Sequence, residues 1–343
     1  MMEGVRPGPR NLITDVEGIA VGNAEDPRIL TGTTVVVPDG QMVVAADIRG
    51  GAPGSRETPA LEVENLVEAF HAIVLSGGSV FGLDAASAVA TELARRGKGF
   101  AFGQQAWPCP VVPAAILFDL MNGGDKAWGD EAPYHRLGRA AFSALSKEFA
   151  LGNAGAGLGA MAGQIKGGLG SASARWNGYT VGALVAVNSV GSCVRPDSAR
   201  LWAADHAIGD EMGPQTRAAG LPPRPRLSGT KLELMTAAAE PGANTTIAVV
   251  ATDARLGKSE AKRLAIMAAD GLSQAIRPMH TPFDGDTVFA AATGRIALAE
   301  PRALTLARLG SLAAATLARA VGRAVWEAQS AGIVPSYRAL AGL

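Results

Sequence analysis

The stretch PGANTTIAVV, residues 241–250, decides the fold. Its glycine-containing turn leads through two threonines into the apolar run Ile247–Val250, which predicts a buried β-strand. A threonine at the mouth of a buried strand is common. It gains meaning here because cleavage between Asn244 and Thr245 would free a threonine with both a hydroxyl and an α-amine, which is a nucleophile with its own base. Thr245 is therefore the candidate nucleophile, and Thr246 stays open as an alternative.

The amino-acid composition argues against some classes of function. Among 343 residues, 31 Lys and Arg balance 31 Asp and Glu, and this zero formal net charge argues against nucleic-acid binding. The two cysteines, Cys109 and Cys193, form no CxxC pair, and residues 1–10 contain no apolar leader, so a cytoplasmic protein with reduced thiols is expected. The apolar stretch Val181–Val187 is too short and broken to span a bilayer, so no membrane partner is expected.

Short β-type runs alternate with helical runs along the chain, which predicts an α/β fold of layered sheet with helices outside. Two neighbouring strands, Thr33–Val37 and Met42–Ile48, are expected to be joined by the turn at 38–40. The proline-rich segment 221–226 is the best candidate for a linker. Further strands are expected at 72–75, 180–187, 247–252 and 287–292, and helices at 62–70, 79–96, 136–149, 232–239, 258–276 and 302–329.

Two glycine-rich segments are candidate binding loops. Gly155–Ala160 matches GxGxxA but lacks a preceding strand, which favours a wall allowing close backbone approach to a substrate or another strand over nucleotide binding. Gly77–Gly82 lies between a strand and a helix, where anion or carbonyl binding and a tight turn capped by Ser79 both stay open. The four histidines have no metal-binding spacing, and the sequence predicts no metal and no cofactor.

Three further polar positions have ordinary explanations when taken alone. The carboxylates Asp284 and Asp286 precede a predicted strand and fit a turn, a metal-ligand pair or a catalytic pair, without the continuation of an EF-hand. Lys166 lies in a glycine-rich segment, where a lone lysine is normally a solvated charge. Asn188 ends an apolar strand, where asparagine is normally a turn residue.

Together these pieces resemble the DmpA-type L-aminopeptidase/D-esterases, a family that includes the β-peptidyl aminopeptidases and the nylon-oligomer endohydrolase NylC. The resemblance covers nearly the whole chain. The Asn-Thr-Thr junction and the Asp-Gly-Asp-Thr motif are more similar to the nylon-hydrolase branch than to the members with a serine nucleophile. The family implies a single α-β-β-α sandwich over residues 1–343, also found in ornithine acetyltransferase-like proteins, that cleaves itself into 1–244 and 245–343. The segments that carry the resemblance are 13–22, 75–84, 155–170, 186–188, 244–246 and 284–287.

The resemblance also implies a catalytic role for each of the polar residues above. Thr245 would attack an amide carbonyl, and its α-amine, with a reference pKa of roughly 7.7–8.0, would take the proton. Lys166 would favour the neutral amine by charge repulsion, and Asn188 would donate to the oxyanion. Asp284 and Asp286 would hold Lys166 and the threonine hydroxyl in place.

One position departs from the family. Some members place a tyrosine beside the oxyanion in a segment resembling Pro113–Leu120, and here that position is Phe118, which cannot donate. The substrate therefore stays open among α-peptide, β-peptide, D-ester and nylon oligomer. The expected partner is a small peptide or amide, and the resemblance implies a homotetramer, or a larger assembly, of cleaved heterodimers. Acyl transfer to ornithine and a non-catalytic binding protein that never cleaves are the alternatives.

Overall fold

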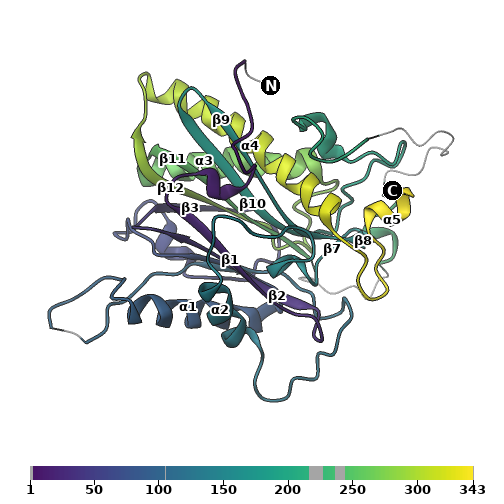
Figure 1. Cartoon of the computed structure of the whole chain (residues 1–343), viewed down its shortest axis with the longest axis horizontal. Helices are drawn as coiled ribbons and strands as arrows, with labels where there is room; N and C mark the ends of the chain where they lie inside the picture. Colours follow the sequence, from purple (N-terminus) through teal and green to yellow (C-terminus); the bar gives the residue numbers. More distant parts are fainter. Residues whose placement is uncertain (1–2, 105, 216–226, 236–243, 343) are drawn as a thin grey trace.

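The computed structural model describes residues 3–104, 106–215, 227–235 and 244–342. Two five-stranded sheets pack face to face, and helices cover the outer face of each sheet (Figure 1). This arrangement is the predicted α-β-β-α sandwich.

The first sheet has the strand order β1-β2-β5-β6-β4, in which only β5 and β6 are parallel to each other. Helices α1 (Asp84–Arg95) and α2 (Tyr134–Ser143) pack on its outer face. Its strands are β1 (Ile19–Asp26), β2 (Thr31–Pro38), β4 (Ser55–Arg56), β5 (Ile73–Ser76) and β6 (Ala114–Ile116). Short 3-10 turns lie at Ile13–Asp15, Thr58–Leu61, Ser79–Leu83 and, as η4, at Gly155–Gly157.

The second sheet has the order β3-β12-β11-β10-β9, in which β11 and β12 are parallel and the other pairs antiparallel. Helices α3 (Lys258–Ala275) and α4 (Arg302–Glu327) cover it. Its strands are β3 (Val43–Ile48), β9 (Gly168–Trp176), β10 (Tyr179–Asn188), β11 (Thr245–Arg255) and β12 (Thr287–Ala297). The remaining elements are the hairpin of β7 (Met161–Ala162) and β8 (Ile165–Lys166), the turns η5 (Trp202–His206) and η6 (Lys231–Glu233), and α5 (Tyr337–Ala341).

Alternation of side chains along β11 connects two of the three apolar layers. Ile247 and Val249 point between the two sheets, where they join the central cluster. Ala248 and Val250 point the other way, into the cluster beneath α3 and α4. The third cluster lies between the first sheet and α1 and α2. The face on which a β11 residue lies therefore decides which layer its side chain enters.

Helix α4 packs closely on β9 because β9 carries glycine at the contact. A Cβ at Gly170 would lie 2.0 Å from the carbonyl oxygen of Ala320, and one at Gly168 would lie 2.5 Å from that of Ala324. At these two positions of β9 the partner is a helix. In the predicted glycine-rich wall at Gly155–Ala160 the partner is a strand, because a Cβ at Gly157 would lie 2.0 Å from the backbone nitrogen of Leu169 in β9. By length and composition α4 is apolar enough to cross a membrane, yet 72% of its apolar window is buried here, as in a core helix.

The expected pairing of the strands at 33–37 and 42–48 is wrong. Both strands form, as β2 and β3, but β2 pairs with β1 and β5 whereas β3 pairs with β12. Every residue of β2 is buried, and both of its edges are occupied within the first sheet. The turn at 38–40 therefore carries the chain from one sheet to the other.

The helix expected at 62–70 is also absent, and the segment forms turns and extended chain. The amine of Lys258 donates to the carbonyls of Ala60, Glu62 and Asn65, at 3.2, 2.6 and 2.8 Å. These carbonyls serve a lysine from α3, which favours turns over the i to i+4 ladder of a helix. The other predicted strands and helices are present with shifted ends, except that the helix at 232–239 is reduced to η6 over its described part; 221–226 lies outside the described residues.

Candidate active site

The candidate nucleophile and the candidate oxyanion donor are neighbours across two strands. The antiparallel register of β10 and β11 sets Asn188 opposite Thr245. Leu184 and Ile247, which share the faces of these residues, pack between the sheets, so both polar side chains begin on that inner face. Asn188 is 0% and Thr245 1% exposed. The sequence placed both residues at strand ends, and the register brings them together.

The peptide bond between Asn244 and Thr245 is held at its carbonyl oxygen. The N–H of Gly285 donates to this oxygen at 2.9 Å, and the Thr245 hydroxyl donates to the same atom. Asn244 also forms a parallel bridge with Asp284. An N–H donor at a carbonyl oxygen stabilises the negative charge that develops there during attack on the carbonyl carbon.

Thr246, the alternative nucleophile, lies on the opposite face of β11. Ala248 and Val250 share that face and pack beneath α3 and α4. The Thr246 hydroxyl is buried and has no hydrogen-bond partner among the described residues. The geometry therefore favours Thr245, whose hydroxyl touches the bond that would be cut.

The side chain of Asn188 is anchored on both sides of its amide. Its Nδ2 donates to the carbonyl oxygen of Phe118 at 2.8 Å. Its Oδ1 accepts from the N–H of Met161 at 2.8 Å and from the side chain of Asn122 at 3.2 Å. An asparagine amide has two hydrogens, so one remains for an oxyanion. Phe118 thus contributes to the site through its carbonyl, and Asn122 is a neighbour that the sequence did not indicate.

Lys166 is buried, with 2% of its surface exposed. Burial lowers the pKa of its amine to about 7, while the charge of Asp119 acts in the opposite direction. The hydrogen bonds of this amine run to the carbonyl oxygens of Gly157, Ala160 and Gly167, at 2.8, 3.1 and 2.8 Å.

The expectation that the carboxylate pair holds Lys166 is wrong. Within the described parts of the chain, Lys166 makes no hydrogen bond or ion pair with Asp284 or Asp286. The reason lies in the fold: β8 directs the lysine amine into the loop at 157–160, which offers carbonyl oxygens in place of carboxylates.

Asp286 organises the backbone beside the nucleophile rather than its hydroxyl. Its Oδ1 accepts from the N–H of Thr246 at 2.8 Å. Its Oδ2 accepts from the N–H of His280 at 3.1 Å and lies 3.0 Å from the Nδ1 of the same residue. The hydroxyl of Thr245 donates to a carbonyl, so the expected contact between that hydroxyl and the carboxylates is also wrong for the uncut chain. The sequence analysis did not identify His280 as a neighbour of this site. The only feature of the sequence that could have indicated it is its position six residues before Asp286.

Asp284 connects the junction to the segment after β10. Its Oδ1 accepts from the N–H of Val190 at 3.1 Å, and its Oδ2 accepts from the N–H and the hydroxyl of Thr281, at 3.0 and 2.6 Å. Burial raises the pKa of this carboxyl, and the neighbouring charge of Asp286 raises it further. Asp284 therefore holds a proton more tightly than an ordinary aspartate does.

Lys231 is the residue of the junction that the sequence did not reveal. Its Nζ lies 2.6 Å from the side-chain oxygen of Asn244. Burial lowers the pKa of this amine to about 7, against the charge of Asp284. No spacing motif connects Lys231 to the threonines, so only the fold brings them together.

A second buried carboxylate, Asp119, fills the turn at 77–82. Its Oδ1 accepts from the N–H of Gly78 at 2.9 Å, and its Oδ2 accepts from the hydroxyl of Thr31 at 2.7 Å. Burial raises its pKa, and the charge of Lys126 opposes this effect. The group that accepts from the N–H of this turn is thus the Asp119 side chain of the chain itself.

The two remaining predictions about glycine-rich turns are resolved by backbone geometry. Ser79 does not cap the turn, because Gly78 is the residue before its first position and Ser79 itself has a φ of 53°. At Gly155–Ala160 the chain forms η4, and two carbonyl oxygens of the segment accept from Lys166. Inward carbonyls of this kind are unsuited to phosphate, which needs backbone N–H donors.

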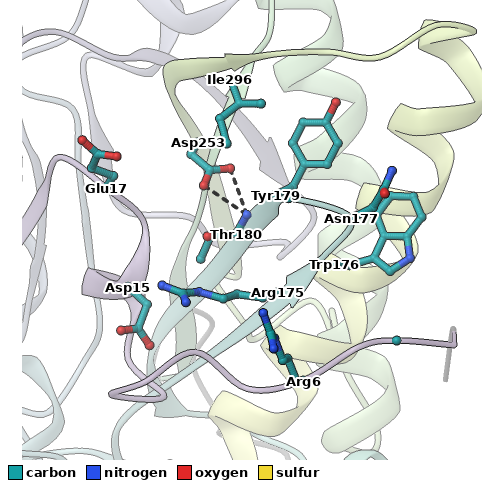
Figure 2. A pocket seen from close by; sticks show the side chains of 12 residues that line it. Arg6, Asp15, Glu17, Arg175, Trp176, Asn177, Tyr179, Thr180, Asp253 and Ile296 are labelled. Carbon is teal, nitrogen blue, oxygen red and sulfur yellow. Dashed lines mark hydrogen bonds between the residues drawn. The ribbon is translucent and has the colours of Figure 1, made fainter.

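A separate pocket of about 450 Å³ lies at the other end of β10 (Figure 2). Arg6 and Arg175 line it together with Trp176, and Asp253 accepts from the N–H of Thr180 at 2.9 and 3.1 Å. None of the predicted catalytic residues lines this pocket. Among the described residues no group of three His, Cys, Asp or Glu side chains is arranged to hold a metal ion.

Two sheets that pack face to face, with helices outside each of them, define the class of the fold, an α-β-β-α sandwich. Residues 11–335 match the model of peptidase family S58. The chain belongs to this family, which confirms the resemblance to the DmpA-type proteins, and it is a hydrolase of peptide or amide bonds.

Related proteins agree with this assignment. An uncharacterized aminopeptidase of Mycobacterium tuberculosis is 40% identical over 347 residues, covering 96% of this chain and 97% of the relative. A 6-aminohexanoate-oligomer endohydrolase of Kocuria sp. is 30% identical, covering 94% of this chain and 85% of that protein. The solved L-aminopeptidase D-Ala-esterase/amidase of Ochrobactrum anthropi, described as a variant of the Ntn hydrolase fold, superposes with a TM-score of 0.68 at 20% identity, covering 96% of this chain and 90% of that one.

Proposed function

We propose that this protein is a self-processing amide hydrolase that cuts itself between Asn244 and Thr245 and then uses the freed Thr245 on small peptides or amides. The observation that carries the proposal is the environment of the Asn244 carbonyl oxygen. It accepts from the N–H of Gly285 at 2.9 Å and from the hydroxyl of Thr245. Nucleophile, target carbonyl and oxyanion donor are therefore together in the uncut chain.

In the cleavage step, Thr245 Oγ1 bonds to the carbonyl carbon of Asn244 and the C–N bond breaks. The nitrogen takes the hydroxyl proton and becomes the α-amine of Thr245. Water then hydrolyses the resulting ester, which leaves a carboxylate on Asn244 and restores the hydroxyl. The N–H of Gly285 stabilises the oxyanion of the first step.

In the hydrolysis step, Thr245 Oγ1 bonds to a substrate carbonyl carbon while its new α-amine accepts the hydroxyl proton. The α-amine passes this proton to the leaving amine as the substrate C–N bond breaks, and water then hydrolyses the ester, which releases the acid and restores the hydroxyl. The unused amide hydrogen of Asn188 donates to the substrate oxyanion. Asp286 fixes the backbone at Thr246, and Lys166 fixes the loop at 157–160. Both act as positioning groups, and no step requires a metal or a cofactor.

The family and the names of the relatives support a substrate class. One relative is an endohydrolase of 6-aminohexanoate oligomers, which are linear amides. Others are named aminopeptidases. We therefore propose small peptides or amide oligomers as substrates, and a homotetramer of cleaved heterodimers as the assembly. Release of the acyl group to water rather than to ornithine separates this function from acetyl transfer.

The test is the mass and the N-terminal sequence of the purified protein under denaturing conditions. We expect two chains, residues 1–244 and 245–343, with the smaller one beginning Thr-Thr-Ile-Ala-Val. A start at Thr246 would move the nucleophile by one residue. A start at Ile247, or a permanently intact chain without amidase activity, would overturn the proposal.

A further inference from the structure

Lys231 stands beside the bond that the proposed function cuts, yet no step described above uses it. The N–H of Lys231 donates to the carbonyl oxygen of Val190 at 2.9 Å. The N–H of Val190 donates in turn to Asp284 at 3.1 Å. The backbone of Lys231 is therefore anchored to the segment that follows Asn188, independently of its side chain.

The side chain of Lys231 reaches from this anchor to the residue before the cut. Its Nζ donates to Oδ1 of Asn244 at 2.6 Å. Part of the lysine is exposed, but burial of the amine lowers its pKa to about 7, against the charge of Asp284. Both the ammonium and the neutral amine donate hydrogen bonds, so the contact persists on either side of neutral pH.

Asn244 is consequently held at two points that flank its Cα. Its carbonyl oxygen accepts from Gly285, and its side-chain oxygen accepts from Lys231. Its other amide atom, Nδ2, is buried without a partner among the described residues. Two anchors around one Cα restrict the torsions that decide where the carbonyl carbon faces. That direction matters because a displacement of about 1 Å lowers the rate of a positioned reaction by about 10²-fold.

We propose that Lys231 is a positioning residue for self-cleavage, which fixes the side chain of Asn244 and so directs the Asn244 carbonyl toward Thr245 Oγ1. The inference rests on the proposed function, because it concerns the same bond. Lys231 contacts neither the reacting carbon nor the reacting oxygen. Its role belongs to the uncut chain, so cleavage depends on it more than hydrolysis by molecules that are already cut.

The experiment measures the rate of cleavage in chains made by cell-free synthesis and sampled on denaturing gels after a short labelling pulse. Lys231→Met is expected to cut about ten- to a hundredfold more slowly than the wild type. Lys258→Met is the matched control. It makes the same change at a different lysine, which lies beyond the opposite end of β11 and whose amine donates to backbone carbonyls. This variant is expected to cut at the wild-type rate.

A double variant with Asn244 distinguishes the positioning role of Lys231 from a purely structural role. Asn244→Ala removes the other end of the same contact, so each single variant is expected to slow cleavage. The double variant is expected to be no slower than the slower single variant, because both remove one interaction. The amidase rate per cut molecule is expected to change less than the cleavage rate. Rate losses that multiply in the double variant, or wild-type cleavage in Lys231→Met, would overturn the role.

A more conservative variant keeps the test decisive if Lys231→Met does not fold, as judged by circular dichroism. Lys231→Gln retains a donor on a shorter side chain and is expected to cut more slowly than the wild type; an unchanged rate would overturn the role. The two proposals fail differently. An intact wild-type chain overturns the proposed function, whereas a wild type and a lysine variant that cut equally fast overturn only the role of Lys231.

Discussion

The hydroxyl of Thr245 donates to the carbonyl oxygen of the preceding residue in the uncut chain. Because one hydroxyl serves both steps, we expect Thr245→Ala to be uncut and inactive, and Thr245→Ser to keep part of each reaction. Thr246→Ala is the control, since it removes a hydroxyl from the opposite face of β11 and is expected to cut. Denaturing gels and release of amine from a model amide measure both reactions. Normal cleavage in Thr245→Ala would contradict the assignment.

In the proposed mechanism Asn188 has both a catalytic and a structural role. Asn188→Ala is expected to lower kcat by about 10²–10³-fold, through loss of an oxyanion donor. It also removes a hydrogen-bond partner from the N–H of Met161 and from the carbonyl of Phe118, both partly buried, so Tm should fall as well. Asn122→Ala removes one neighbour of the amide and retains the donor, so its kcat should fall less. A near-normal kcat in Asn188→Ala would limit Asn188 to packing.

The buried amine of Lys166 makes stability depend on pH in a defined direction. Its folded pKa of about 7 lies below the ordinary lysine value, so the unfolded chain binds more protons between these two values. The loss of folding stability caused by burying this amine is complete below pH 7 and becomes smaller as the pH rises toward about 10. In an uncut Thr245→Ala background, Lys166→Met removes this dependence. The Tm advantage of Lys166 over methionine should therefore grow between pH 6 and pH 9.5, and an advantage equal at both values would contradict the burial of a titrating amine.

At the scale of elements, continuous apolar, β-branched runs in the sequence indicated β10 and β11, and both strands are buried along almost their whole length. The register that sets Asn188 opposite Thr245 depends on pairing between distant segments, which no local pattern encodes. The absent helix at 62–70 has the same cause, since its carbonyls are taken by Lys258 from another part of the chain. The resemblance to a family supplied the candidate residues, but their contacts had to come from the fold.

The contact between β9 and α4 depends on the absence of a side chain. Gly170→Ala would place a Cβ 2.0 Å from the carbonyl oxygen of Ala320, which forces the helix away from the sheet. Overpacking of this kind typically destabilises by about 1–3 kcal/mol, so Tm should fall measurably. Gly40→Ala is the control, because a Cβ there meets no atom within 4 Å. Equal Tm values for the two variants would show that α4 accommodates the added group.

At the scale of the whole molecule, the proposed cut divides one sheet between two chains. Residues 245–343 would contribute β11 and β12, while 1–244 would contribute β3 on one side of this pair and β10 and β9 on the other. Both outer edges of the small chain's strand pair are thus hydrogen-bonded to the large chain. Helix α4 of the small chain also covers β9 and β10 of the large one. The two chains therefore share one core.

This shared core predicts that the cut protein behaves as one unit. The two chains should coelute in native size-exclusion chromatography and separate only in denaturant, because separation would expose the central cluster and leave strand edges unpaired. Uncut Thr245→Ala is the control and should elute at the same volume, since cleavage breaks one peptide bond and no strand pairing. Denaturant should unfold and dissociate the pair in a single transition. Elution of a free 245–343 chain under native conditions would contradict the division of the sheet, because that chain would carry β11 and β12 with both outer edges bare.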